Sequence, residues 1–132
     1  MKIKILELDR PNKNGRVYPN NVFKKALYKV NTKIKNGKFF VYDKTFENEP
    51  SGSINNALIV VGTVNEISIN DYEVYAHVKF NNENEILKKK FKEKEFHLRT
   101  YGNGTPTLQS NGTLLIGEDY ELYGLFLTKD PA

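Results

Sequence analysis

Apolar and polar positions alternate along much of this chain with the two-residue period of a β-strand. Residues 72–80 alternate strictly, and the β-branched residues 57–69 precede them. Asn70 and Asp71 separate the two segments, so we predict an antiparallel hairpin. The apolar phase shifts near Asn65 and Glu66, which predicts a β-bulge there.

Several shorter segments also have strand patterns. In residues 1–9 the alternation slips by one position at Leu6, which indicates a bulge or two partly covered faces. Asn111 and Gly112 predict a two-residue hairpin turn between residues 107–108 and 114–116. Further strands are predicted at residues 38–42, 96–101 and 120–127.

Two segments show helical spacing instead. The first has an apolar stripe from Val22 to Ile34, a predicted N-cap at Asn20 and a stop at Gly37. The second, residues 83–92, has a predicted N-cap at Asn82 and Glu85 in the capping-box position.

Strands therefore outnumber helices, and tight turns join neighbouring strands. We predict a β-dominated α+β fold, a small and partly closed antiparallel β-barrel with two flanking helices. A chain of 132 residues suits one domain, residues 1–132. Its eight Tyr and eight Phe supply enough bulky apolar surface for one core.

The composition excludes several kinds of site. Cysteine is absent, which rules out disulfides, thiolate zinc sites and a cysteine nucleophile. No apolar run is long enough to span a bilayer, and charges interrupt the amino terminus where a signal peptide would be apolar. We therefore expect a soluble protein made in a cytoplasm, with no membrane partner and no cofactor. Asp43, Glu47 and Glu49 lie close in sequence, but their spacing fits no calcium loop, so no metal is expected.

The net charge of +4 changes this picture little. Much of the excess lies in two lysine clusters, at residues 24–29 and 88–94, and Glu93 and Glu95 are interspersed with the second cluster. Such a mixture is more typical of a solvated helix face than of a phosphate-binding track. Nucleic-acid binding is therefore not the function we expect.

Positions 14–19 carry the most specific motif, the run Asn-Gly-Arg-Val-Tyr-Pro before the first predicted helix. This run resembles the tailed-phage prohead (capsid maturation) protease family, relatives of the herpesvirus capsid protease. The hairpin at residues 62–79 and the ending at residues 120–132 are also similar to that family. The resemblance spans nearly the whole chain and implies the family's barrel fold.

The same resemblance implies where a catalytic pair would stand. Thr45 occupies the position of the family's histidine base, and His97 and Leu98 occupy the two serine positions, while Arg99 matches. Threonine is not a base near neutral pH, and a serine protease needs both the hydroxyl and its base. We therefore interpret the chain as a catalytically inactive member, with no catalytic residues. A relocated pair of His97 and Ser110 stays open as an alternative, although no orienting carboxylate is implied.

These observations lead to a functional hypothesis. We expect a non-catalytic phage virion protein, an auxiliary or minor capsid protein of the decoration type, located in the capsid and in the host cytoplasm during assembly. Its expected partner is the major capsid protein, with other virion proteins and self-association within the lattice as further options. The alternatives are an active maturation protease with relocated residues, or an internal scaffold or DNA-contacting core protein. The candidate contact residues are Asp43, Glu47, Glu49, Tyr72, Tyr75, Tyr101 and Asn103, together with Tyr18.

Overall fold

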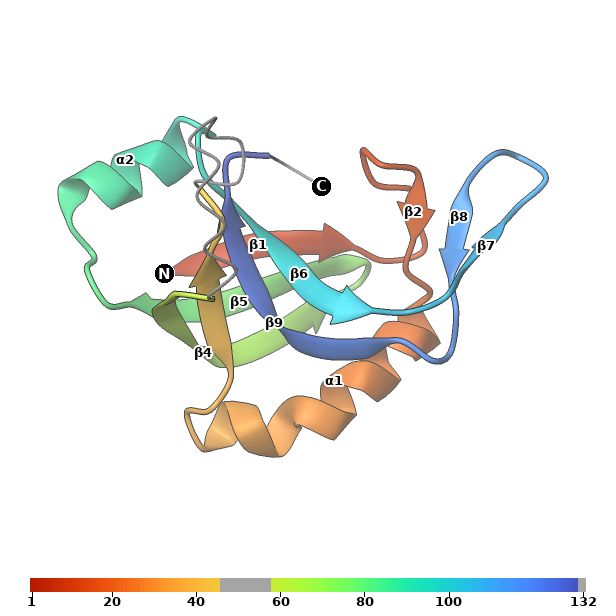
Figure 1. The fold of residues 1–132 in the computed structure, drawn as a ribbon, viewed down its shortest axis with the longest axis horizontal. Coiled ribbons are helices and arrows are strands. Elements are labelled where there is room, and N and C mark those ends of the chain that lie inside the picture. Colours follow the sequence, from red (N-terminus) through yellow and green to blue (C-terminus); the bar gives the residue numbers. More distant parts are fainter. Residues whose placement is uncertain (46–57, 131–132) are drawn as a thin grey trace.

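The computed structural model describes residues 1–45 and 58–130. Its main sheet has six strands in the order β1-β5-β4-β3-β9-β6, and a smaller sheet has three in the order β2-β8-β7 (Figure 1). The strands of the main sheet are β1 (Lys2–Glu7), β5 (Glu73–Phe80), β4 (Val60–Asn70), β3 (Phe40–Asp43), β9 (Glu121–Thr128) and β6 (His97–Asn103). The smaller sheet contains β2 (Arg16–Val17), β8 (Leu114–Ile116) and β7 (Pro106–Leu108), and the helices are α1 (Asn20–Lys35) and α2 (Glu85–Lys92).

The main sheet curls into a half-barrel, in which the two edge strands β1 and β6 approach each other. The predicted β-dominated fold with two helices is thereby confirmed. Two strand pairs depart from the expected antiparallel pattern: β3 and β9 run parallel in the main sheet, and β2 and β8 run parallel in the smaller sheet. The strands of each pair are far apart in sequence, so no tight turn constrains their relative direction.

The predicted bulges and the central hairpin are confirmed. The β4–β5 register shifts between Val64 and Glu66, and the hairpin turns at Asp71, whose φ is +56°. A second bulge between Lys4 and Leu6 resolves the slipped alternation in β1. It allows the consecutive residues Ile5 and Leu6 both to be buried.

Both predicted helix N-caps are wrong by one or two residues. Pro19 precedes α1 in an extended conformation, and the N–H of Asn20 donates instead to Asp9 Oδ1 at 2.9 Å. For α2 the cap is Asn84, whose Oδ1 accepts from the N–H of Leu87 at 2.9 Å. Glu83 Oε1 accepts from the N–H of Phe80 at 3.0 Å, so the side chain of Glu83 bonds back to the end of β5. Glu83 therefore lies in the connection, and α2 begins at Glu85.

The β7–β8 hairpin forms where expected, but its turn is longer than the predicted two residues. The N–H of Gln109 donates to the carbonyl of Thr113 at 2.8 Å, which leaves a three-residue loop, residues 110–112. Asn111 Oδ1 accepts from the N–H and hydroxyl of Thr113, and Gly112 adopts φ +86°. A three-residue hairpin loop needs such a left-handed residue. The Asn-Gly pair therefore correctly indicates a hairpin, but the loop has three residues instead of the predicted two.

One hydrophobic core lies between the concave face of the main sheet and the apolar stripe of α1. The stripe contributes Val22, Phe23, Ala26, Val30 and Ile34, all buried. The α2 helix has no fully buried residue, and it packs against the core through the partly buried side chains of Leu87 and Phe91. Neither described helix has the length and apolar character needed to cross a membrane.

Candidate functional site

The run at positions 14–19 joins three parts of the fold. Gly15 adopts φ +76° and turns the chain into β2, where Arg16 lies opposite Leu114 of β8. The next residue after β2, Tyr18, is buried and packs edge-on against Tyr120, which directly precedes β9. Gly15 and Tyr18 thus have structural roles, because they position the chain between β2, α1 and β9.

Hydrogen bonds from the preceding loop fix this arrangement. Asp9 donates its N–H to the Tyr18 carbonyl at 2.9 Å and accepts from the Asn20 N–H through its carboxylate. Asn12 Oδ1 accepts from the N–H groups of Asn14 and Arg16, at 2.9 and 3.0 Å. These hydrogen bonds give the motif a role in folding, because they fix the turn that leads into β2 and the connection from β2 into α1.

The positions where the family resemblance implies a catalytic pair lie at one end of the main sheet. Leu127 of β9 pairs with Asp43 of β3 on one side and with Leu98 of β6 on the other. Two strand spacings separate Asp43 from Leu98, about 10 Å. The segments that contain Thr45 and Leu98 therefore lie at the same end of the main sheet.

The side chains at these positions lack the required chemistry. The hydroxyl and N–H of Thr45 both donate to Asp43 Oδ1, at 2.7 and 2.8 Å. Leu98 is 3% exposed and forms part of the core. Threonine at the position of the histidine supplies no base, and a buried leucine at a serine position supplies no nucleophile.

His97, the first residue of β6, is half-buried and lies opposite Thr128. Within residues 1–45 and 58–130 its side chain makes no hydrogen bond or ion pair. Ser110 lies in the β7–β8 loop of the smaller sheet, beyond the opposite end of β6. The seven-residue strand β6 alone spans about 20 Å, so the structure does not bring His97 and Ser110 together.

A charged contact that sequence reasoning missed lies near the same end. Asp130 approaches Arg99 Nη1 and Lys13 Nζ, each at 3.8 Å, and its N–H is held by Thr128 Oγ1 at 3.1 Å. Arg99, the residue of this segment that matches the family pattern, is therefore paired with Asp130. No spacing rule could have found it, because Lys13 and Asp130 lie at opposite ends of the chain.

Comparison with known proteins agrees with this arrangement at the level of the fold. No protein-family model matches the chain, and no curated protein matches it. Among solved structures, the chain is similar to the bacteriophage T4 capsid assembly protease gp21, with a TM-score of 0.74 and 15% sequence identity. The match covers 97% of this chain and 79% of the gp21 chain. The chain has a phage prohead-protease-like fold. The fold implied by positions 14–19 is thus confirmed.

The prohead-protease-like fold carries a group of aromatic side chains on the convex face of its sheet. Tyr101 lies at the centre, 4.4 Å from Phe126, 5.4 Å from Tyr123 and 5.8 Å from Tyr42 between ring centroids. We call this group, completed by Phe40 next to Tyr42, the aromatic face. Gly124 makes room for it, because a Cβ there would lie 2.9 Å from the Tyr42 ring.

Sequence reasoning selected Tyr101 from the aromatic face and missed its neighbours. The signal that would have found them is the register of three strands, since β3 and β6 flank β9. Tyr42 and Arg99 both lie opposite Phe126, and Tyr101 lies opposite Gly124. Such pairings cannot be read from one strand alone, because they depend on which strands lie side by side and in which register.

The other candidate contact residues are dispersed over the prohead-protease-like fold. Tyr18 belongs to the core, whereas Asn103 is exposed at the end of β6. The guanidinium of Arg10 lies 3.3 Å from the ring centroid of Tyr72, and Asp43 is engaged with Thr45. Outside the described residues lie Glu47 and Glu49, and also Pro131 and Ala132 of the chain's ending.

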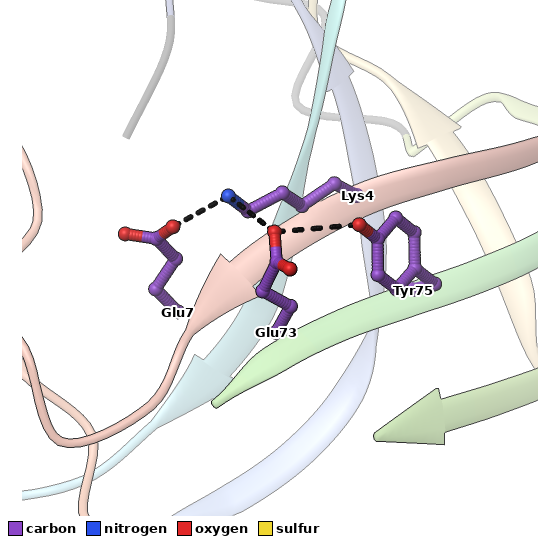
Figure 2. Close-up of polar contacts among 4 residues, drawn as sticks. All are labelled: Lys4, Glu7, Glu73 and Tyr75. Atoms are coloured by element: carbon purple, nitrogen blue, oxygen red, sulfur yellow. Dashed lines mark hydrogen bonds and ion pairs between the residues drawn. The ribbon is translucent and has the colours of Figure 1, made fainter. Parts of the chain in front are cut away.

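Tyr75, the remaining candidate, belongs to a charged cluster that links β1 to β5 (Figure 2). Lys4 Nζ contacts Glu7 Oε2 and lies 3.0 Å from Glu73 Oε2, which also accepts from the Tyr75 hydroxyl at 3.3 Å. The hydrogen bond from Lys4 to Glu7, and to a smaller extent the one to Glu73, raises the pKa of Lys4 above its usual range. The hydrogen bond from Lys4 lowers the pKa of Glu73. Both groups are therefore charged at neutral pH and act as an exposed clamp between the two strands.

Proposed function

We propose that this chain is a non-catalytic structural protein of a phage virion, an auxiliary capsid protein that binds the major capsid lattice. The observation that supports the proposal is that the chain has the fold of a capsid assembly protease but has Thr45, His97 and Leu98 where the resemblance implies a histidine and two serines. Leu98 is buried in the core, and the Thr45 hydroxyl is committed to Asp43. A fold of this kind that lacks a nucleophile and its base is suited to binding.

The chemistry of acyl transfer supports this reading. A serine protease needs a hydroxyl within hydrogen-bond reach of a base, and a third group that orients the base. His97 has no carboxylate partner among the described residues, and Ser110 lies in the β7–β8 loop of the smaller sheet. The relocated pair therefore gains no support from the geometry.

The aromatic face is the surface that we assign to the capsid partner. Tyr123 is 44% exposed, and the other four rings are half-buried around it. Tyr and Phe are enriched in protein interfaces because they bury a large area with little loss of rotational freedom. Asn103 and the edge strand β6 border this face and can supply polar contacts.

Purified particles test the proposal directly. We expect quantitative mass spectrometry to find the chain at a regular ratio to the major capsid protein, and cryo-electron microscopy to locate it on the shell. Particles made without it should contain normally cleaved precursors. A low copy number combined with uncleaved precursors in its absence would identify a protease instead.

The assigned surface has its own test. Tyr123→Ser removes the most exposed ring of the aromatic face, and we expect it to reduce incorporation into particles. Tyr28→Ser on α1, where the ring is 82% exposed, is the matched control and should incorporate normally. Normal incorporation of Tyr123→Ser would exclude the aromatic face as the contact while leaving the copy-number result intact.

A further inference from the structure

A groove of about 830 Å³ runs along the open edge of the main sheet. Its walls are formed by β1, by the loop at residues 10–13, by the C-terminal half of α2 and by the first residues of β6. The groove thus lies where the half-barrel fails to close. It is separate from the aromatic face, whose residues do not line it.

The rim of the groove is strongly basic. Among the described residues that line it, seven are Lys or Arg, and Glu7 alone is acidic. Lys4 forms ion pairs with Glu7 and Glu73, Lys13 with Asp130, and Lys88 with Glu85. Lys92 and Lys94, by contrast, form no ion pair with any residue in the described ranges. The groove therefore presents positive charge that the described part of the chain does not neutralise.

The floor of the groove is apolar. Ile3, Phe91 and Phe96 are partly buried there, and Leu98 closes it from below. The aromatic rings are already engaged, since Phe91 packs against Phe80 and Phe96, and Lys90 lies 5.2 Å from the Phe96 ring centroid. A floor of this kind accommodates aliphatic side chains better than it accommodates stacked bases.

One wall of the groove is the edge of a strand. The amino group of Met1 donates to the Val78 carbonyl, and the N–H of Val78 donates to the Met1 carbonyl, both at 2.8 Å. Hydrogen-bonded pairs alternate along an antiparallel ladder, so Ile3 bonds toward β5 while Lys2 and Lys4 direct their backbone groups away from it. β1 is an edge of the sheet, so these groups can pair with an added chain.

We propose that the groove binds an extended acidic peptide segment of a partner protein. Apolar side chains of the segment lie on the floor, its carboxylates meet Lys92 and Lys94, and its backbone pairs with β1 beside Lys2 and Lys4. This inference goes beyond the proposed virion role and does not depend on it. A nucleic acid would use the same positive charge, but it would leave the aliphatic floor and the strand edge without partners.

Peptide binding tests the chemistry of the groove. The probe is a fluorescein-labelled eight-residue peptide of alternating Glu and Val, and its control has Gln in place of every Glu. We expect fluorescence anisotropy to show saturable binding of the Glu peptide, weakened by salt, and at least about tenfold weaker binding of the Gln peptide. Absence of binding by the Glu peptide, or tighter binding of an oligothymidine of similar charge, would overturn the proposal.

Paired variants locate the binding. The double variant Lys92→Glu/Lys94→Glu reverses two charges on the rim of the groove, and it should weaken binding of the Glu peptide about tenfold or more. Lys24→Glu/Lys25→Glu makes the same charge change on the exposed face of α1 and should leave binding nearly unchanged. Equal weakening by both pairs would show attraction to net charge alone and would refute a groove site.

Amide hydrogen exchange supplies a readout that a charge effect cannot imitate. Bound peptide should slow exchange at the amides of Lys2 and Lys4, which face away from β5. The amide of Ile3 already bonds toward β5 and should change little. Unchanged exchange at Lys2 and Lys4 in the saturated complex would refute pairing with β1.

Discussion

The ring of Tyr18 packs edge-on against the ring of Tyr120, with centroids 5.4 Å apart and planes at 77°. Tyr18 links β2 to α1, and Tyr120 leads into β9, so this contact joins two ends of the chain. Phe23 of α1 also stacks on the Tyr120 ring, with centroids 6.5 Å apart. The tyrosine of the Asn-Gly-Arg-Val-Tyr-Pro run is therefore a core residue.

Replacing Tyr18 tests this role. We expect Tyr18→Ala to lower the free energy of unfolding by about 3–5 kcal/mol, because it leaves a cavity beside Tyr120. Tyr18→Phe keeps the ring and should cost less than about 1 kcal/mol. Urea denaturation followed by circular dichroism measures both. Tyr28→Ala, at the exposed surface of α1, should change stability by less than about 0.5 kcal/mol.

The Tyr120 hydroxyl provides a second prediction. It is buried and makes no hydrogen bond with the described residues, although Thr100 lies nearby. A buried polar group without a partner carries a desolvation cost, so Tyr120→Phe should raise the free energy of unfolding by about 1 kcal/mol. A clear loss of stability in this variant would mean that the hydroxyl has a partner in solution.

The pH dependence of stability follows from the same residue. Burial raises the pKa of Tyr120 above its ordinary value of about 10. Above that pH the unfolded chain loses the Tyr120 proton while the folded chain keeps it, so stability falls as pH rises. We expect a shallower fall in Tyr120→Phe than in the natural chain, measured by denaturation between pH 9 and pH 11. Identical slopes would contradict the assignment to Tyr120.

Local patterns predicted what depends on neighbours in sequence. The apolar stripe from Val22 to Ile34 is the buried face of α1, and the phase slip near Asn65 is a bulge in β4. Both features follow from the period of a single element, so they are visible without the fold. The same patterns predicted the fold class, and the run at positions 14–19 supported it through its resemblance to a known family.

Contacts between distant segments could not be predicted in the same way. The parallel pairing of β3 with β9 and the aromatic face around Tyr101 depend on strand order and register. The cap of α1 was missed because Asp9, eleven residues earlier, accepts the Asn20 N–H. At the candidate site, sequence located the Thr45 and Leu98 segments but could not show that Asp43 binds Thr45.

The N-cap of α2 gives a matched pair of variants. Asn84 Oδ1 accepts the Leu87 N–H at 2.9 Å, so Asn84→Ala should lower the free energy of unfolding by about 1 kcal/mol. Asn82 is exposed and lies outside the helix, so Asn82→Ala should have almost no effect. Thermal denaturation of both variants measures the difference. A larger loss for Asn82→Ala would support the capping box predicted from the sequence.

The absence of a reactive hydroxyl is the last prediction. A fluorophosphonate reacts with a serine only when a nearby base activates its hydroxyl. We expect no labelling of this chain by a fluorophosphonate probe, as detected by intact-mass spectrometry, because the Thr45 hydroxyl binds Asp43 and Leu98 carries no hydroxyl. A serine protease of known activity serves as the positive control.

The same measurement separates the two remaining readings of His97 and Ser110. An active pair would give labelling at Ser110 that both His97→Ala and Ser110→Ala abolish. The strand β6 places these residues far apart, so we expect the natural chain and both variants to be equally unreactive. Labelling of the natural chain that is lost in either variant would require the two segments to meet, and it would make the chain a protease with a relocated catalytic pair.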